Sequence, residues 1–284
     1  MNTQRITCNR FDISNRMETK SRTRTAHGKA IVETSEIISH AADAVTSRED
    51  VNKFVSEMLS KKAWTMAGLF ILGANTGFRC GDMLAFKVSD FDLINKPESI
   101  NIIEQKTGKV RVVYLNNAVY KAIEMIINKK NLKDDDYLFT SDSPRKSYFL
   151  DYKRNEDGEI VDIITTNERY DSYGNERKIA PVTVDSVARA FKKHTKNAGI
   201  TGHYSSHCAR KTFSYFISSH EYKSVKNITA ASMALNHSSE SITEKYYTKG
   251  VDSKELKDVW LNLNLGLECI GGLNEEIVWY IEKI

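Results

Sequence analysis

The chain has 284 residues, a net charge of +4 and a mean hydropathy of −0.45. This composition excludes a membrane protein and a wholly disordered chain, and the length suffices for one large domain with an appendage or for two small ones. The four cysteines lie far apart and form no Cys-x-x-Cys pair, which argues against a zinc site and a disulfide scaffold. Because the first residues also lack the pattern of a signal peptide, we expect a reducing, cytoplasmic setting.

Basic residues concentrate in two parts of the chain. Residues 1–33 hold seven basic and three acidic side chains, and residues 187–227 hold eight basic side chains and one acidic. Such patches suit a polyanion, most commonly nucleic acid. For either patch alone, a basic face exposed only to solvent is an equal alternative.

Residues 1–33 have few apolar positions and no periodicity, so we interpret them as a flexible basic arm. The pattern turns helical at Thr34. A capping-box-like start at Ser47 then precedes an apolar stripe that predicts an amphipathic helix. Residues 62–74 predict a second, buried helix that stops at the breaker of residues 75–77. A short helix follows over residues 80–84.

A β signature comes next in the sequence. Residues 98–105 and 110–115 flank a Lys-Thr-Gly-Lys turn, which predicts a hairpin with Lys106 at its tip. Residues 116–130 form an amphipathic helical pattern. The polar, tyrosine-rich stretch of about 145–180 indicates an insertion, either a hairpin or a mobile excursion.

The remainder is helical in pattern. Thr183 and Gly199 are typical start and stop signals for one helix. Three further helices are expected, to about Ser219, over 228–235 and around Tyr246. The predicted fold class is therefore mainly α with a small antiparallel sheet (α+β). We expect one domain over 34–262 and a tail over 263–284, whose apolar end docks on a neighbour or on its own core.

Five places in this order carry residues suited to chemistry. An arginine and an acid follow the 75–77 breaker, a lysine lies on the hairpin tip, and His-x-x-Arg begins a helix. Further on, a histidine precedes two adjacent tyrosines; the residues are Arg79, Asp82, Lys106, His207, Arg210, His237, Tyr246 and Tyr247. Taken singly, each has a structural alternative, such as an ion pair on a helix face, a solvated turn lysine, a capping histidine or a packing tyrosine.

Taken together, these motifs resemble the active-site set of the tyrosine recombinase (phage integrase) family. That family shows Thr-Gly-x-Arg-x-x-Glu/Asp, a hairpin lysine, His-x-x-Arg, Leu-Gly-His-Ser-Ser and a tyrosine nine residues after that histidine. The chain matches at 76–79 with Asp82, at Lys106, at 207–210, at 235–239 and at Tyr246. The resemblance covers about residues 45–260 and implies the catalytic-domain fold of the family.

The resemblance also implies a role for each residue. Arg79 and Arg210 would clamp the scissile phosphate, because guanidinium forks bind phosphate oxygens in a bidentate manner. Lys106 would be the general acid, and Asp82 would orient Arg79. His237 would donate a hydrogen bond to the phosphate, and His207 would help to accept the tyrosine proton. Tyr246 would attack to give a 3′-phosphotyrosine, with neither metal nor other cofactor.

The chain departs from the family pattern in several respects, which include the 145–180 insertion and Ala209, where the family usually has a larger hydrophobic residue. Asn236 replaces the usual glycine, and Tyr247 competes with Tyr246, which only the spacing favours. Family members also usually carry a separate core-binding domain in front of the catalytic domain. Only about 45 residues precede the catalytic helices here, so we expect the full core-binding domain to be absent. The protein would then grip DNA unusually, borrow a partner or no longer recombine.

The leading hypothesis is therefore site-specific recombination by a cytoplasmic enzyme of a phage or other mobile element. It would act on double-stranded DNA as a dimer to tetramer of identical chains, without a membrane. The expected DNA contacts are Lys109, Arg189, Lys192, Lys193 and Lys211. Two alternatives stay open, a non-catalytic DNA-binding regulator on the same fold and a type IB topoisomerase. Topoisomerases of that type carry lysine where His207 stands, which argues against the second.

Overall fold

The computed structural model describes residues 5–6, 42–103, 108, 110–143, 147–155, 157, 159–222, 225–226, 228–235 and 253–271. Its helices are α1 (Arg48–Ser60), α2 (Trp64–Thr76), α3 (Cys80–Leu84), α4 (Asn117–Lys130), α5 (Val184–Asn197), α6 (Cys208–Ser219), α7 (Ile228–Ala234), α9 (Ser253–Leu261) and α10 (Leu267–Ile270). Its strands are β1 (Arg5–Ile6), β2 (Ser99–Ile103), β3 (Val110–Tyr114), β4 (Phe149–Arg154), β5 (Ile160–Thr166), β6 (Glu221–Tyr222) and β7 (Val225–Lys226). The α+β class predicted from the sequence is confirmed.

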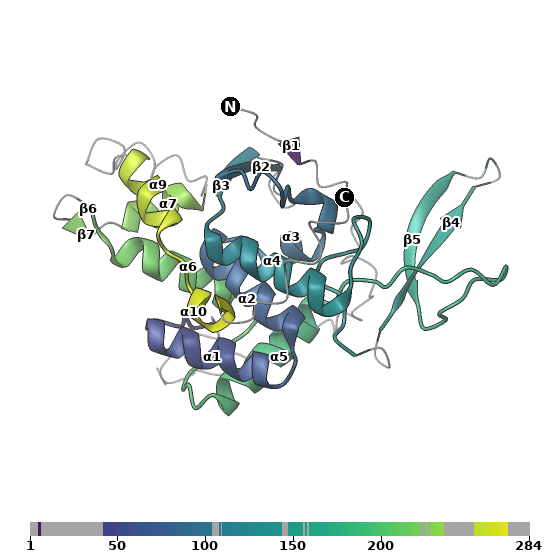
Figure 1. Ribbon diagram of the computed structural model, residues 1–284, viewed down its shortest axis with the longest axis horizontal. Coiled ribbons are helices and arrows are strands. Elements are labelled where there is room, and N and C mark those ends of the chain that lie inside the picture. The colour runs from purple at the N-terminus through teal and green to yellow at the C-terminus, as the bar shows by residue number, and fades with distance from the viewer. Residues whose placement is uncertain are drawn as a thin grey trace, which may run out of the picture.

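Helix α2 forms the centre of the molecule, and α1, α4 and α6 surround it (Figure 1). Every residue from Thr65 to Thr76 is buried, which explains why the sequence is apolar nearly all round. Glycine lets α4 approach closely, since a Cβ at Gly68 would overlap the Ile126 side chain. Phe54 and Phe70 pack edge to face with ring centroids 4.7 Å apart, and each also contacts Phe191 of α5.

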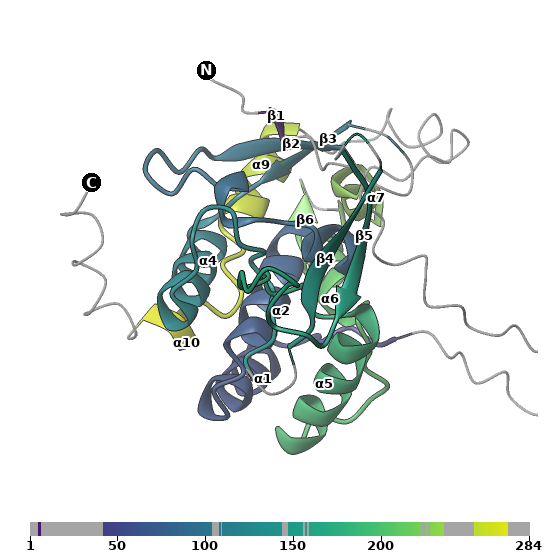
Figure 2. The same cartoon turned by 90° about the vertical axis from the view of Figure 1, so that its right-hand side faces the viewer.

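A small sheet lies at the end of the molecule opposite α1 and α5 (Figure 2). Strands β2 and β3 pair antiparallel from Ser99↔Tyr114 to Ile103↔Val110, which confirms the predicted hairpin. Lys106 at its turn lies outside the described residues. Arg5 and Ile6 add a short parallel strand to β2, an arrangement that the sequence did not predict for the basic arm.

The insertion is a hairpin that projects from the helical body (Figure 1). Strands β4 and β5 pair from Phe149↔Thr166 to Arg154↔Ile160, with a register shift at Lys153/Arg154. The chain that returns after β5 closes the base of the hairpin, where the Leu150 amide donates to the Lys178 carbonyl at 2.8 Å. Of the two forms considered from the sequence, the hairpin is therefore the one observed.

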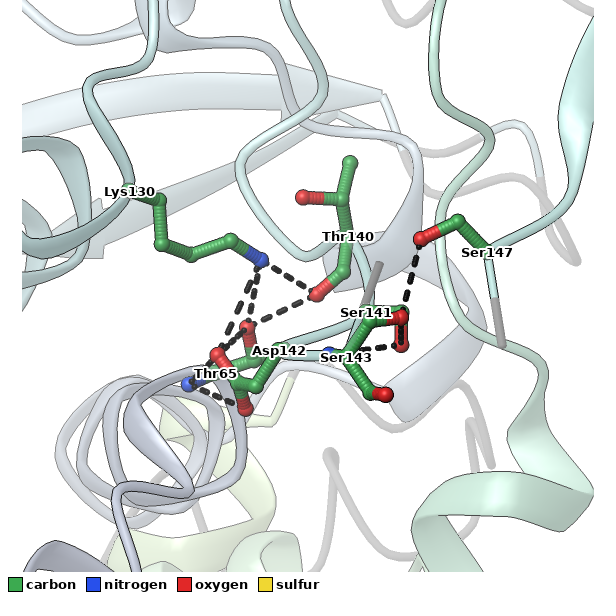
Figure 3. Close-up of polar contacts among 7 residues, drawn as sticks. All are labelled: Thr65, Lys130, Thr140, Ser141, Asp142, Ser143 and Ser147. Carbon is green, nitrogen blue, oxygen red and sulfur yellow. Dashed lines mark hydrogen bonds and ion pairs between the residues drawn. The ribbon is translucent and has the colours of Figure 1, made fainter. Parts of the chain in front are cut away.

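A polar cluster fixes the chain where it leaves for this hairpin (Figure 3). The Thr65 amide, in the first turn of α2, donates to both carboxylate oxygens of Asp142 at 3.2 and 3.1 Å. Lys130 Nζ, at the end of α4, lies 3.8 Å from Asp142 Oδ1 and donates to Thr65 Oγ1 at 2.9 Å and to the Thr140 carbonyl at 2.5 Å. Burial raises the pKa of Asp142 and lowers the pKa of Lys130 to about 8. The cluster thus supplies α2 with the N-terminal cap that Ala63 lacks.

The carboxyl-terminal segment packs against the same core. Asn75 Nδ2 donates to the Leu265 carbonyl at 3.0 Å, and its Oδ1 accepts from the Leu265 amide at 2.9 Å. Trp260 Nε1 donates to the Asn75 carbonyl at 2.7 Å. Residues 263–271 therefore pack against the core of the same chain. Residues 272–284 of the predicted tail are outside the described residues.

The sequence prediction was wrong at one helix. The helical pattern starting at Thr34 does not continue through residues 42–47, which are irregular. Ala42 and Val45 are buried because this segment packs as a strap: the Asp43 amide donates to the His203 carbonyl, and the Val45 amide donates to Thr212 Oγ1 of α6. Residues 34–41 are not among those described. In the described part of the chain, no helix is long and apolar enough to cross a membrane.

Candidate active site

The turn after α2 positions the first candidate arginine. Gly77 adopts a left-handed conformation with φ of +66°, and a Cβ there would also lie 2.7 Å from Leu235 Cδ2. Only glycine adopts this backbone conformation without strain and also lacks the Cβ that would overlap Leu235. Arg79 is the N-cap of α3, and its Nη1 lies 3.7 Å from Asp82 Oδ2. The predicted arginine–acid pair is therefore present, with the carboxylate almost completely buried.

Helix α6 carries the second candidate arginine to the same turn. Arg210 lies in the first turn of α6, and its Nη1 donates to the Gly77 carbonyl. The α6 start thus lies beside the turn that presents Arg79. The same turn thus presents one arginine and accepts a hydrogen bond from the other.

His207 occupies the N-cap position of α6, but its side chain makes no capping hydrogen bond. Its side chain is exposed, while its backbone amide bonds to Ser205 Oγ at 3.4 Å. The capping role considered from the sequence is therefore not what the imidazole does. The ring stands at a helix start, where backbone N–H groups and the helix dipole favour an anion.

Two buried thiols lie next to these residues and cannot serve as nucleophiles. Burial raises the pKa of Cys80, which follows Arg79, to about 12. It also raises the pKa of Cys208, which follows His207 and is completely buried. Both thiols therefore favour the protonated form at neutral pH. Among the described residues, no group of three histidine, cysteine or acidic side chains could hold a metal ion.

Some predicted site residues lie outside the described residues. These are Lys106, Lys109, His237, Tyr246 and Tyr247. The elements that lead to them are described: β2 and β3 run to the Lys106 turn, and α7 ends at Ala234, three residues before His237. Leu235 is buried beside Gly77, so the chain enters the His237 segment at the Arg79 turn.

The candidate DNA contacts on helices are exposed. Arg189, Lys192 and Lys193 lie with Lys196 at i, i+3, i+4 and i+7 and form one stripe of α5. Lys211 is exposed on α6. Their exposure fits contact with a polyanion and also fits a solvated basic face.

Sequence reasoning missed Arg111, whose side chain is only 3% exposed. Its Nη2 donates to the Thr76 carbonyl at 3.0 Å and its Nη1 to the Ala234 carbonyl at 3.3 Å. Its guanidinium lies 5.3 Å from the centroid of the Phe78 ring. The signal was the alternation of β3, which places Arg111 on the same inward face as Val113.

Comparison with known proteins identifies the class. The chain belongs to the phage integrase family, whose model matches residues 44–253. It is 25% identical over 213 residues to the probable integrase/recombinase YoeC of Bacillus subtilis, covering 75% of this chain and 92% of that protein. Family membership supports a role in DNA recombination and confirms the resemblance drawn from the motifs.

Two solved structures are similar at lower levels. XerA recombinase aligns over 74% of this chain and 64% of its own, with 19% identity and a TM-score of 0.43. The integrase of mycobacterium phage Brujita aligns over 86% of this chain and 61% of its own, with 15% identity and a TM-score of 0.45. The chain thus spans less than two thirds of the length of either.

Proposed function

We propose that this chain is a site-specific DNA recombinase that cuts and rejoins double-stranded DNA through a 3′-phosphotyrosine intermediate. The observation that carries the proposal is the Gly77 carbonyl, which accepts from Arg210 two residues before Arg79. This contact brings the two arginines of separate family motifs to one turn. The family match over residues 44–253 supports the same activity.

The proposed reaction is a transfer of the scissile phosphate between oxygens. The Tyr246 hydroxyl oxygen attacks phosphorus as His207 accepts the phenolic proton, and the bond to the 5′ oxygen breaks. Lys106 gives that oxygen a proton, which leaves a 5′-hydroxyl strand and a phosphotyrosine. Attack by a 5′-hydroxyl of another strand reverses these steps and rejoins DNA.

The remaining groups stabilise charge in the transition state. Arg79, Arg210 and His237 donate to the non-bridging oxygens as negative charge develops on them. Asp82 fixes the Arg79 fork by its ion pair. The enzyme is proposed to act in the cytoplasm as a dimer to tetramer on DNA, with Lys109, Arg189, Lys192, Lys193 and Lys211 binding backbone phosphates.

Covalent capture tests the proposal although the DNA target is unidentified. The full chain is incubated with sheared genomic duplexes carrying random nicks, so that a short 5′-hydroxyl fragment released beside a nick diffuses away. Denatured protein–DNA adducts are then purified, sequenced and digested for mass spectrometry. We expect adducts on a small set of related sequences, with DNA attached to Tyr246.

Matched variants decide the assignments. Tyr246→Phe should abolish adducts and Tyr247→Phe should leave them; the reverse result would move the nucleophile to Tyr247. Arg79→Met and Arg210→Met should each slow adduct formation by about a hundredfold or more. Specific DNA binding without any adduct would instead indicate a regulator. Relaxation of supercoiled plasmid without sequence preference would indicate a topoisomerase.

A further inference from the structure

Arg111 lies where three segments of the proposed site converge. It belongs to β3, which follows the Lys106 turn, and it bonds to the last residue of α2 and the last residue of α7. Helix α2 leads into the Arg79 turn, and α7 leads into the His237 segment. One guanidinium in β3 thus joins the last residues of α2 and α7.

The chemistry of its partners explains why an arginine occupies this position. Carbonyls in the last turn of a helix lack partners within the helix and carry the negative end of its dipole. The Thr76 and Ala234 carbonyls are of this kind. A planar guanidinium has donors pointing in several fixed directions, so one group can serve two helix ends, whereas a lysine ammonium is a single compact charge.

Packing removes the remaining freedom of this side chain. Phe78, which is 1% exposed, lies beneath the guanidinium and packs edge to face against Phe86 at a centroid distance of 5.1 Å. Phe78 separates Gly77, the acceptor for Arg210, from Arg79. Arg111 therefore bonds to the Thr76 carbonyl on one side of Gly77 and contacts the Phe78 ring on the other.

We propose that Arg111 is a positioning residue that sets the end of α2, and with it the Arg79 turn, relative to β3 and to the end of α7. The inference rests on the proposed function. At 3% exposure Arg111 does not reach the DNA, so it acts through the Arg79 turn and the two helix ends to which it bonds. A shift of about 1 Å in such groups costs up to about a hundredfold in rate.

Hydrogen exchange on the full chain tests the positioning without DNA. Arg111→Met removes the charge and the donors but keeps the side-chain length, and Arg111→Lys keeps the charge. We expect the Gly77, Phe78 and Leu235 amides to exchange at least tenfold faster in Arg111→Met and by an intermediate factor in Arg111→Lys. Arg177→Met is the matched control, because the Arg177 side chain is only 11% exposed and also bonds to carbonyls, but in the insertion.

Cleavage of the captured DNA separates positioning from general stability. Arg111→Met should slow single-turnover cleavage tenfold to a hundredfold while the Kd for DNA and its salt dependence change less than threefold; Arg177→Met should change neither. Unchanged exchange at residues 77–79, an equal rise throughout α1 and α5, or an unchanged cleavage rate would each overturn the proposal. If the unaltered protein captures no DNA, the proposed function fails, and exchange alone still decides whether Arg111 holds the turn.

Discussion

Single polar residues inside the core decide how the ends of the helices meet. Asn75 is completely buried and uses its amide and carbonyl groups to join α2, the start of α4 and the carboxyl-terminal segment. Arg111 does the same for the ends of α2 and α7. Local patterns place Asn75 at a helix end and Arg111 on an inward face, but they do not identify the partners of either residue, which lie far away along the chain.

Replacing Asn75 with alanine should lower the free energy of unfolding by about 3 kcal/mol, since the Leu265 amide and carbonyl would be left without a partner in a buried site. Urea unfolding of the full chain measures the change. Asn262→Ala is the matched control; its side chain is exposed and bonds to the nearby Asp258 carbonyl of α9, so its effect should stay below about 0.5 kcal/mol. Equal effects of the two changes would contradict the role assigned to Asn75.

Elements whose signals are local were predictable from the sequence. Ser47 and Thr183 cap α1 and α5 as expected, because a cap needs only the next three residues. The start of α2 was not predictable in the same way, since its cap is Asp142 and is stabilised by Lys130. The irregular strap at 42–47 was misinterpreted as helical for a related reason. Its apolar residues are buried against α6, and the sequence of the strap alone does not show that contact.

In the candidate site, too, local motifs were predictable from the sequence and contacts between distant segments were not. The motifs located Arg79, Asp82 and Arg210, and the structure shows the contacts that join their segments. Local spacing could not show that Gly77 is the shared element, because the residues that exclude a side chain there are Phe213 and Leu235. The roles of Lys106, His237 and Tyr246 remain predictions.

The contact between α1 and α5 should make stability depend on pH. His194 Nδ1 lies 3.5 Å from Glu57 Oε1, which also accepts from Asn197 at 2.9 Å. Burial lowers the pKa of His194 below its ordinary 6.5, so the folded state binds fewer protons there than the unfolded state. The pKa of Glu57 is lowered as well, chiefly by Asn197. Both shifts remove stability as the pH falls, the histidine from about 6.5 downward and the glutamate below about 4.5.

We therefore expect the urea midpoint to fall between pH 7.5 and 5, and the fall to be smaller in His194→Gln, which has no titrating ring. His203→Gln is the matched control, because it removes an exposed histidine by the same substitution. A pH profile unchanged by His194→Gln would refute the assignment.

At the scale of the whole molecule, charge separates the inserted hairpin from the helical body. Residues 149–178 hold eight acidic and five basic side chains, although the chain as a whole is positive. Five of their large hydrophobic side chains are exposed: Tyr152, Ile160, Val161, Tyr170 and Tyr173. This combination disfavours contact with phosphates, whereas the α5 stripe favours it.

The structure permits a clean removal of the hairpin. Leu150 and Lys178 already share a hydrogen bond, so an Asn-Gly turn can replace residues 151–177. The excision removes both partners of the ion pair between Asp151 and Arg177, at 3.4 Å, so neither of these charges loses its partner. Lys178 keeps its ion pair with Asp135 at 3.2 Å. We expect this variant to remain folded.

DNA binding should distinguish the two surfaces. In fluorescence anisotropy with the captured duplex, removal of residues 151–177 should leave the affinity and its salt dependence unchanged or slightly raise the affinity. The triple change Arg189→Gln, Lys192→Gln and Lys193→Gln should weaken binding and reduce the slope of log K against log salt by about 0.9 for each phosphate that α5 no longer neutralises. If the excision lowers that slope and the triple change does not, DNA contacts the hairpin and the α5 stripe is only a solvated face.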